Sequence, residues 1–144
     1  MSAEDLALEF VDTNVLLYAY DRSAGRRHEQ AATLVGALGA GRRGALSVQV
    51  LQEFYVNVTR KIAEPLSHDV ALARVRVLSR WPVHVPHAPD VADAAELAQT
   101  SQLSFWDAMI IRSAGALGCT TVWSEDLNHG QRIAGVVVRN PFRP

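Results

Sequence analysis

Short hydrophobic runs alternate along the chain with longer segments in which hydrophobic residues recur every three or four positions. The runs at 119–123 and 135–140 are rich in β-branched residues, which is typical of strands that are covered on both faces. We expect strands at 6–11, 44–47, 82–86, 119–123 and 135–140. The longer segments have the period of amphipathic helices. We expect a helix that begins just after Asp12, and further helices at 26–41, 48–61, 68–80, 90–101 and 106–118.

Strands that alternate with helices predict right-handed crossovers and a parallel sheet with helices on both sides. With 144 residues, one domain is long enough to bury roughly 70% of its unfolded surface. No repeat, linker or low-complexity segment interrupts the pattern. The sequence therefore predicts a single domain, 1–144, with a three-layer α/β/α sandwich.

Composition narrows the class of protein but not its activity. The chain is 49% hydrophobic and 20% charged, as in ordinary globular proteins. Cys119 is the lone cysteine, which excludes an internal disulfide and a thiolate zinc cluster and suggests a buried hydrophobic residue. The first residues lack the basic region of a signal peptide, and no apolar stretch approaches the ~20 residues that span a bilayer. We expect a cytoplasmic protein with no membrane contact.

The formal net charge of −1 argues against a protein that binds nucleic acid through overall basicity. The charge need not be evenly spread. If several carboxylates gather around metal ions, the rest of the chain is net positive.

Acidic residues from four distant segments are expected at one edge of the sheet. Asp12 directly follows the first strand, and Asp126 follows the strand at 119–123. Asp107 lies in the opening turn of a helix, and Glu53 lies in the second turn of another. Parallel sheets bind ligands outside the carboxyl ends of their strands, where the following helices begin. The four carboxylates are therefore candidates for one shared site.

Two of these acids also fit a purely structural role. Asp is a common helix cap, so Asp12 is suited to cap the next helix, although Thr13 or Asn14 is able to do so instead. Ser104 and Asp107 fit a capping box at the start of their helix.

The other two have ordinary alternatives as well, since Glu53 suits a solvated helix face and Asp126 suits a turn. The joint pattern favours chemistry, because clustered carboxylates repel unless cations bind among them. Mg²⁺ and Mn²⁺ prefer such oxygen ligands. A site with carboxylates and without His or Cys favours phosphodiester hydrolysis, in which the ion activates water and stabilises the leaving oxygen.

Four segments together resemble one family: "FVDTNVLLYAYD", "SVQVLQEFYVNVTRK", "LSFWDAMIIRSAGALGCTTVWSEDL" and "VVVRNPF". In this order they look like a PIN-domain ribonuclease, specifically a VapC-type toxin of a toxin–antitoxin pair. The resemblance implies a mostly parallel five-stranded sheet and an acidic site for Mg²⁺ or Mn²⁺. It also implies an RNA substrate, homodimerisation and inhibition by a cognate VapB-type antitoxin.

The resemblance carries over residue by residue. Asn14 and Ser124 match small polar positions that support the acids. The family usually has Thr/Ser-x-Asp at the fourth acidic position, which favours Asp126 over its neighbour Glu125. The catalytic and metal-binding acids implied in this way are Asp12, Glu53, Asp107 and Asp126.

Several other side chains are candidates for contact with RNA or an antitoxin. Arg112 follows Asp107 by four residues, and Arg132 follows Asp126 closely. Trp106 adjoins a proposed ligand, whereas His129 better fits a surface loop.

Three other functions compete with an endoribonuclease. A flap-type DNA nuclease shares clustered acids, but this chain is short and has no obvious arch. A non-catalytic PIN-like module that binds RNA or protein is disfavoured, because all four acids are retained. A haloacid-dehalogenase-type phosphatase needs a second Asp two positions after Asp12, where Asn14 stands.

Overall fold

The computed structural model describes residues 7–144, in which helices and short strands alternate as predicted. The helices are α1 (Thr13–Tyr20), η2 (Arg22–Ala24, a 3₁₀ turn), α2 (Arg26–Ala40), α3 (Val48–Arg60), α4 (His68–Leu78), α5 (Ala88–Ser101) and α6 (Phe105–Ala116). The strands are β1 (Glu9–Val11), β2 (Gly44–Ser47), β3 (Val83–His84), β4 (Thr121–Trp123), β5 (Arg132–Ile133) and β6 (Val136–Arg139). Every helix within the described residues is too short or too polar to span a membrane.

The sheet has the order β3-β2-β1-β4-β6-β5, and all neighbours are parallel except β5 and β6. The mostly parallel α/β fold is therefore confirmed, but the sheet has six strands instead of the five expected. The additional strand, β5, pairs with β6 through a two-residue turn at Ala134 and Gly135, both with positive φ. Such hairpin turns are usually signalled by Asn-Gly or Asp-Gly, so Ala-Gly left the hairpin undetected.

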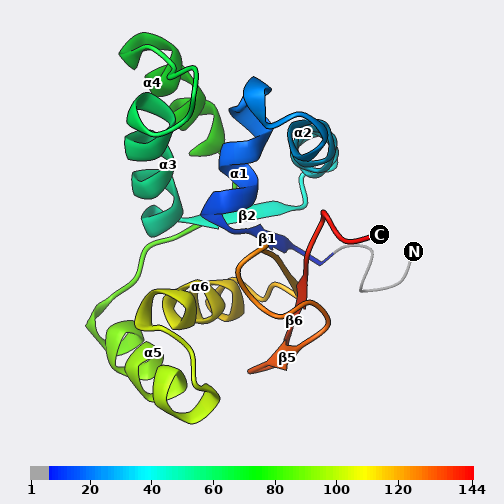
Figure 1. Ribbon diagram of the computed structural model, residues 1–144. Coiled ribbons are helices and arrows are strands. Elements are labelled where there is room, and N and C mark those ends of the chain that lie inside the picture. Colours follow the sequence, from blue (N-terminus) through cyan, green and yellow to red (C-terminus); the bar gives the residue numbers. More distant parts are fainter. Residues whose placement is uncertain (1–6) are drawn as a thin grey trace.

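Helices lie on both sides of the sheet, with α1–α4 on one side and α5 and α6 on the other (Figure 1). The division follows from the strand order. The chain moves outward from β1 to β2 and β3 and then returns to β4, so right-handed crossovers change sides at that point. The carboxyl ends of β1 and β4 flank the position where the strand order reverses, which is where such folds place their sites.

The two sides of the last strands differ in burial. Val136 and Val138 of β6 are buried and lie on the side where α6 packs, whereas Val137 is half-buried and Arg139 is exposed. The prediction that the strand at 135–140 is covered on both faces was therefore wrong. An apolar run with a single Arg at its end gave no signal of this difference.

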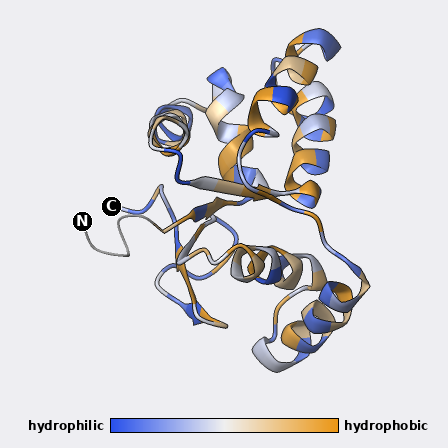
Figure 2. Ribbon diagram, turned by 180° about the vertical axis from the view of Figure 1, so that it is seen from behind, coloured by the Kyte–Doolittle hydropathy of each residue, from blue (hydrophilic) through white to orange (hydrophobic). Residues whose placement is uncertain are grey.

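The core fills the space between the sheet and the helices. Phe10, Leu16, Phe54, Ile110 and Val122 are fully or almost fully buried in one cluster. Each such side chain contributes about 1.5–3 kcal/mol on burial. In Figure 2, α5 carries hydrophilic and hydrophobic residues side by side, as expected of a helix that packs through one face only. The rigid core holds the strand ends that carry the acidic residues.

Candidate active site

The four predicted acids line one cavity of ≈210 Å³. They come from the end of β1, the middle of α3, the first turn of α6 and the loop after β4. The acidic residues in its wall are Asp12, Glu53, Asp107 and Asp126, and the other lining residues are Thr13, Asn14, Leu17, Gln49, Asn57, Trp106 and Ile110. Tertiary structure thus brings together side chains that are far apart in the sequence.

Asp12 is the most deeply placed of these acids, with 6% of its surface exposed. Its Oδ1 accepts a hydrogen bond from the backbone N–H of Thr13 at 2.7 Å, and its Oδ2 accepts one from the Ser124 hydroxyl at 2.8 Å. Asp12 is itself the cap of α1, so neither Thr13 nor Asn14 takes that role. The same carboxylate therefore begins the helix and faces the cavity.

Burial is the main cause that raises the pKa of Asp12 to about 6, and the negative charges of Asp126 and Asp107 raise it further. The hydrogen bonds from Ser124 and Thr13 act in the opposite direction and lower the pKa. A carboxyl group in this environment gains strongly from a bound cation, since the cation would offset both the desolvation and the repulsion.

Asp126 lies in the loop after β4 and is held by the two residues predicted to support the acids. The side-chain amide of Asn14 donates to Asp126 Oδ2 at 2.8 Å. The Ser124 hydroxyl accepts from the backbone N–H of Asp126 at 3.2 Å. Because Ser124 also donates to Asp12, one buried hydroxyl links the two acids. These contacts agree with the supporting roles expected for Asn14 and Ser124.

The remaining two acids approach from helices. Gln49 donates to Glu53 Oε1 at 2.8 Å, one helical turn away on α3. Asp107 lies in the first turn of α6, where its backbone N–H bonds to the Ser104 hydroxyl at 3.1 Å. The predicted Ser104 cap is thereby confirmed. Gln49 was visible in the sequence only as part of a polar stripe with Glu53.

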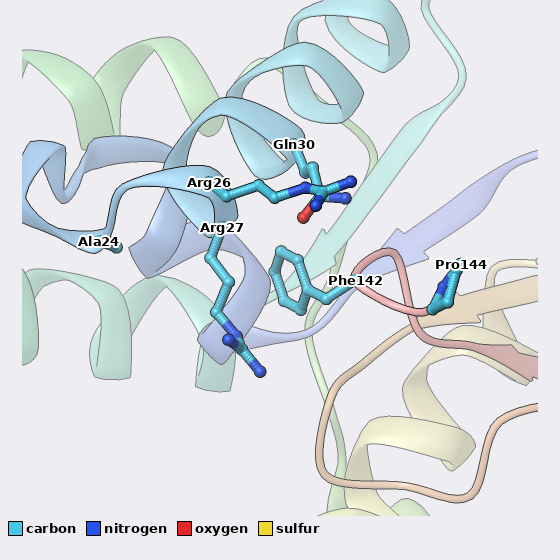
Figure 3. Close-up of a pocket in the computed structure, with 6 residues that line it drawn as sticks. All are labelled: Ala24, Arg26, Arg27, Gln30, Phe142 and Pro144. Atoms are coloured by element: carbon cyan, nitrogen blue, oxygen red, sulfur yellow. The ribbon is translucent and has the colours of Figure 1, made fainter.

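Glu125, the alternative to Asp126, is bound outside the cavity. Arg27 forms an ion pair with it at 2.8 Å, and the Tyr18 hydroxyl donates to it at 3.3 Å. The Arg27 guanidinium lies 5.4 Å from the ring centre of Phe142, along which it extends in Figure 3. Among the two neighbouring acids, only Asp126 lines the acidic cavity. No local pattern in the sequence pointed to Arg27 or Tyr18 as the partners of Glu125.

The two arginines expected to contact RNA or an antitoxin, Arg112 and Arg132, both lie outside the acidic cavity. Arg112 pairs with Asp90 at 3.1 Å and with Asp93 at 3.5 Å, so it ties α6 to α5. Arg132 is on the edge strand β5 and lines a separate cavity. His129 is exposed and its ring accepts a backbone N–H, consistent with the predicted surface role.

The side-chain atoms around the cavity that are able to bind a metal ion are oxygen atoms of carboxylate, amide or hydroxyl groups, which suit a hard divalent ion. Gln49 Oε1 is buried and has no hydrogen-bond partner within the described part of the chain. Over residues 7–144, no three acidic, His or Cys side chains are close enough to form a ready ligand shell. Instead, amide groups of Asn14 and Gln49 bind Asp126 and Glu53. The oxygen ligands of the site therefore fit a divalent cation, which would displace these amide groups from the carboxylates.

Comparison with solved structures shows the same fold in several toxin–antitoxin proteins. A chain of a toxin–antitoxin complex from Klebsiella pneumoniae is 20% identical with a TM-score of 0.68, and the match covers 94% of this chain and 99% of that one. Mycobacterium tuberculosis VapC20, described as a Sarcin-Ricin loop cleaving toxin, is 24% identical with a TM-score of 0.61, over 82% and 91% of the two chains. DNA-bound VapBC from Salmonella typhimurium is 20% identical with a TM-score of 0.64, over 94% and 98%.

A search of curated proteins gave no match. The family model for the PIN domain matches residues 10–134, which is most of the chain and includes all four acids. PIN domains are nuclease-type hydrolases that generally depend on divalent metal ions. The chain therefore belongs to the PIN-domain family.

Proposed function

We propose that this protein is a metal-dependent endoribonuclease and the toxin of a toxin–antitoxin pair. The observation that carries the proposal is the cavity lined by Asp12, Glu53, Asp107 and Asp126. Burial raises the pKa of its most buried acid, Asp12, to about 6, and a divalent ion would offset the cost of keeping that carboxylate ionised. The proposal is supported by the family and by the toxin–antitoxin proteins that share the fold.

In this proposal Asp12, Glu53, Asp107 and Asp126 hold Mg²⁺ or Mn²⁺. When bound, the ion supplies activation of a water molecule and stabilisation of charge on the phosphodiester group. Ser124 and Asn14 hold Asp12 and Asp126 in place through hydrogen bonds of 2.8 Å, and Gln49 does the same for Glu53.

RNA is the substrate in this proposal, and Trp106 is positioned to contact it. The indole is 64% exposed and lies at the wall of the cavity beside Asp107. An exposed aromatic ring next to a phosphodiester site provides a stacking surface for a base of a single-stranded segment. A homodimer, a VapB-type antitoxin and a cytoplasmic location complete the proposal. The VapBC complexes among the structures that share the fold support an antitoxin partner.

Cleavage assays with Asp107→Asn test the activity. The matched control is Asp69→Asn, since Asp69 is also an acid in the first turn of a Ser-capped helix but is exposed on α4. We expect Mn²⁺-dependent RNA cleavage that EDTA stops. Asp107→Asn should reduce the cleavage rate at least about a hundredfold, and Asp69→Asn should cleave RNA at the wild-type rate. A folded Asp107→Asn variant with full activity would remove the assignment.

Substrate class and biological role need separate assays. Single-stranded RNA, structured RNA and DNA flaps are compared under one Mn²⁺ condition, and preferential cleavage of the flaps would favour a DNA nuclease. Binding of RNA without cleavage and without uptake of Mn²⁺ would indicate a non-catalytic module. For the toxin role, we expect expression to arrest growth and co-expression of a small neighbouring gene to relieve the arrest.

A further inference from the structure

A second polar cavity, of ≈370 Å³, lies on the β1-β4-β6-β5 part of the sheet. It shares no lining residue with the acidic cavity. Three of its eight lining residues are arginines and two are threonines; the residues are Glu9, Arg43, Thr120, Thr121, Arg132, Gly135, Val137 and Arg139. We call it the arginine cavity.

Strand register explains why these side chains gather. Glu9 pairs with Thr121, Thr121 pairs with Val137, and Val137 pairs with Arg132, so the four residues form a row across β1, β4, β6 and β5. Arg139 is two positions beyond Val137 and points to the same side. This is the side opposite the one where Val136 and Val138 are buried. On this side of the sheet Arg132 and Arg139 are exposed, whereas Glu9 and Thr121 are buried.

The charge of the arginine cavity is not neutralised from within. Its one carboxylate, Glu9, already accepts from Arg43 and from the indole N–H of Trp123, the latter at 2.9 Å. Within residues 7–144, Arg132 and Arg139 form no ion pair, and both are exposed. The buried Nε of Arg43 also has no acceptor there. The cavity therefore offers several hydrogen-bond donors and a net positive charge to an incoming anion.

We propose that the arginine cavity binds a phosphate group of the RNA backbone, away from the bond that is cut. This inference rests on the proposed function. Guanidinium groups match phosphate oxygens in geometry and charge, and threonine hydroxyls add donors. The lining includes few apolar side chains, which an interface core with a protein partner would require.

One end of the arginine cavity lies near the strand ends that carry the acids. The backbone carbonyl of Arg139 accepts from the N–H of Ser124 at 2.9 Å, and Ser124 in turn bonds Asp12. Arg139 therefore lies one strand away from the loop that carries Asp126. The other lining residues, such as Glu9, Thr121 and Gly135, lie at or before the amino ends of their strands, so the cavity extends from Arg139 away from the acidic cavity.

The test measures RNA binding in EDTA, where the proposed nuclease cannot cut. Arg132→Gln/Arg139→Gln is compared with wild type by fluorescence anisotropy on a labelled single-stranded RNA from 50 to 200 mM KCl. Removal of two phosphate contacts should weaken binding about tenfold or more at low salt. It should also reduce the slope of log affinity against log salt by about 1.4. The control is Arg76→Gln, which removes one positive charge from an exposed position on α4, the helix that precedes β3 at the other end of the sheet. It should change neither the RNA affinity nor the salt slope.

Separate arms distinguish the sources of phosphate and the two proposals. If the double variant binds RNA as wild type does but loses thermal stabilisation by inorganic phosphate, the ligand is free phosphate and the RNA assignment is overturned. Unchanged responses to both ligands would overturn an anion site altogether. If wild type fails to cleave any RNA in Mn²⁺ while the double variant still shows the weaker binding, the arginine cavity stands and the proposed nuclease function falls.

Discussion

Replacement of Asp12 by Asn should stabilise the metal-free protein at neutral pH, although it removes a residue of the proposed active site. The pKa of Asp12 is raised from 3.8 to about 6 by burial and by neighbouring acids. Each pKa unit corresponds to about 1.4 kcal/mol, so ionised Asp12 lowers the free energy of unfolding by about 3 kcal/mol at pH 7. Asn has the same size, accepts from Thr13 through its oxygen and donates to the Ser124 hydroxyl, so the local structure is retained.

The effect has a defined pH window. Below pH 3.8 Asp12 is protonated in both the folded and unfolded chains, and its burial carries no ionisation cost. Between pH 3.8 and about 6 the unfolded chain ionises first, so wild type loses stability as pH rises. Above about pH 6 the cost is constant. The advantage of Asp12→Asn should therefore be about 0.6 kcal/mol at pH 4 and about 3 kcal/mol at pH 7.

Urea unfolding in EDTA at several pH values measures this difference, with Asp69→Asn as the control for loss of an exposed carboxylate. A second series adds Mn²⁺. Wild type should gain stability above pH 6, by about 2.7 kcal/mol at a hundred times the dissociation constant, whereas Asp12→Asn should gain much less. The reasoning is refuted if Asp12→Asn is less stable than wild type at pH 7 in EDTA, or if Mn²⁺ stabilises both proteins equally.

Three further predictions concern other residues. Ser124→Ala should lower the free energy of unfolding by about 1–2 kcal/mol and weaken Mn²⁺ binding about tenfold or more, because the buried hydroxyl joins Asp12 to the Asp126 backbone. Urea unfolding measures the first effect and calorimetric titration the second, and an unchanged Mn²⁺ affinity would contradict the supporting role. Trp106→Ala should change the free energy of unfolding by no more than about 0.5 kcal/mol, since Trp106 is 64% exposed. It should weaken binding of single-stranded RNA by about 1–3 kcal/mol in anisotropy titrations, and an RNA affinity equal to that of wild type would exclude stacking. Burial raises the pKa of the Cys119 thiol to about 12. At pH 8 this thiol should therefore react with a disulfide reagent at least about a hundredfold more slowly in the native protein than in urea. Rapid labelling of the native protein would show that the site opens.

Much of the architecture followed from local sequence. Short apolar runs marked β1 and β2, β-branched runs marked β4 and β6, and helical spacing marked the long helices, because these patterns depend on near neighbours. The rule that ligand sites lie at the carboxyl ends of parallel strands then placed Asp12, Glu53, Asp107 and Asp126 together. Ser104 was predictable as a helix cap, since capping is also a local interaction.

Tertiary structure alone decided how those residues are held. Ser124 and Asp12 are 112 residues apart, as are Asn14 and Asp126, so no local pattern reveals their hydrogen bonds. Arg27 on α2 forms an ion pair with Glu125 in the loop after β4, and only Asp126 of these two acids lines the acidic cavity.

The same holds for surface charge. Arg112 was a reasonable candidate for RNA contact until packing of α6 on α5 placed it against Asp90. Arg132 and Arg139 meet in one cavity only because β5 and β6 pair as a hairpin that no typical turn sequence announced. The sequence by itself determined most of the helices and strands and the edge at which the acids meet, because both follow from short-range patterns. Which charges are paired and which are free was decided by contacts between distant segments, which form only when the chain packs.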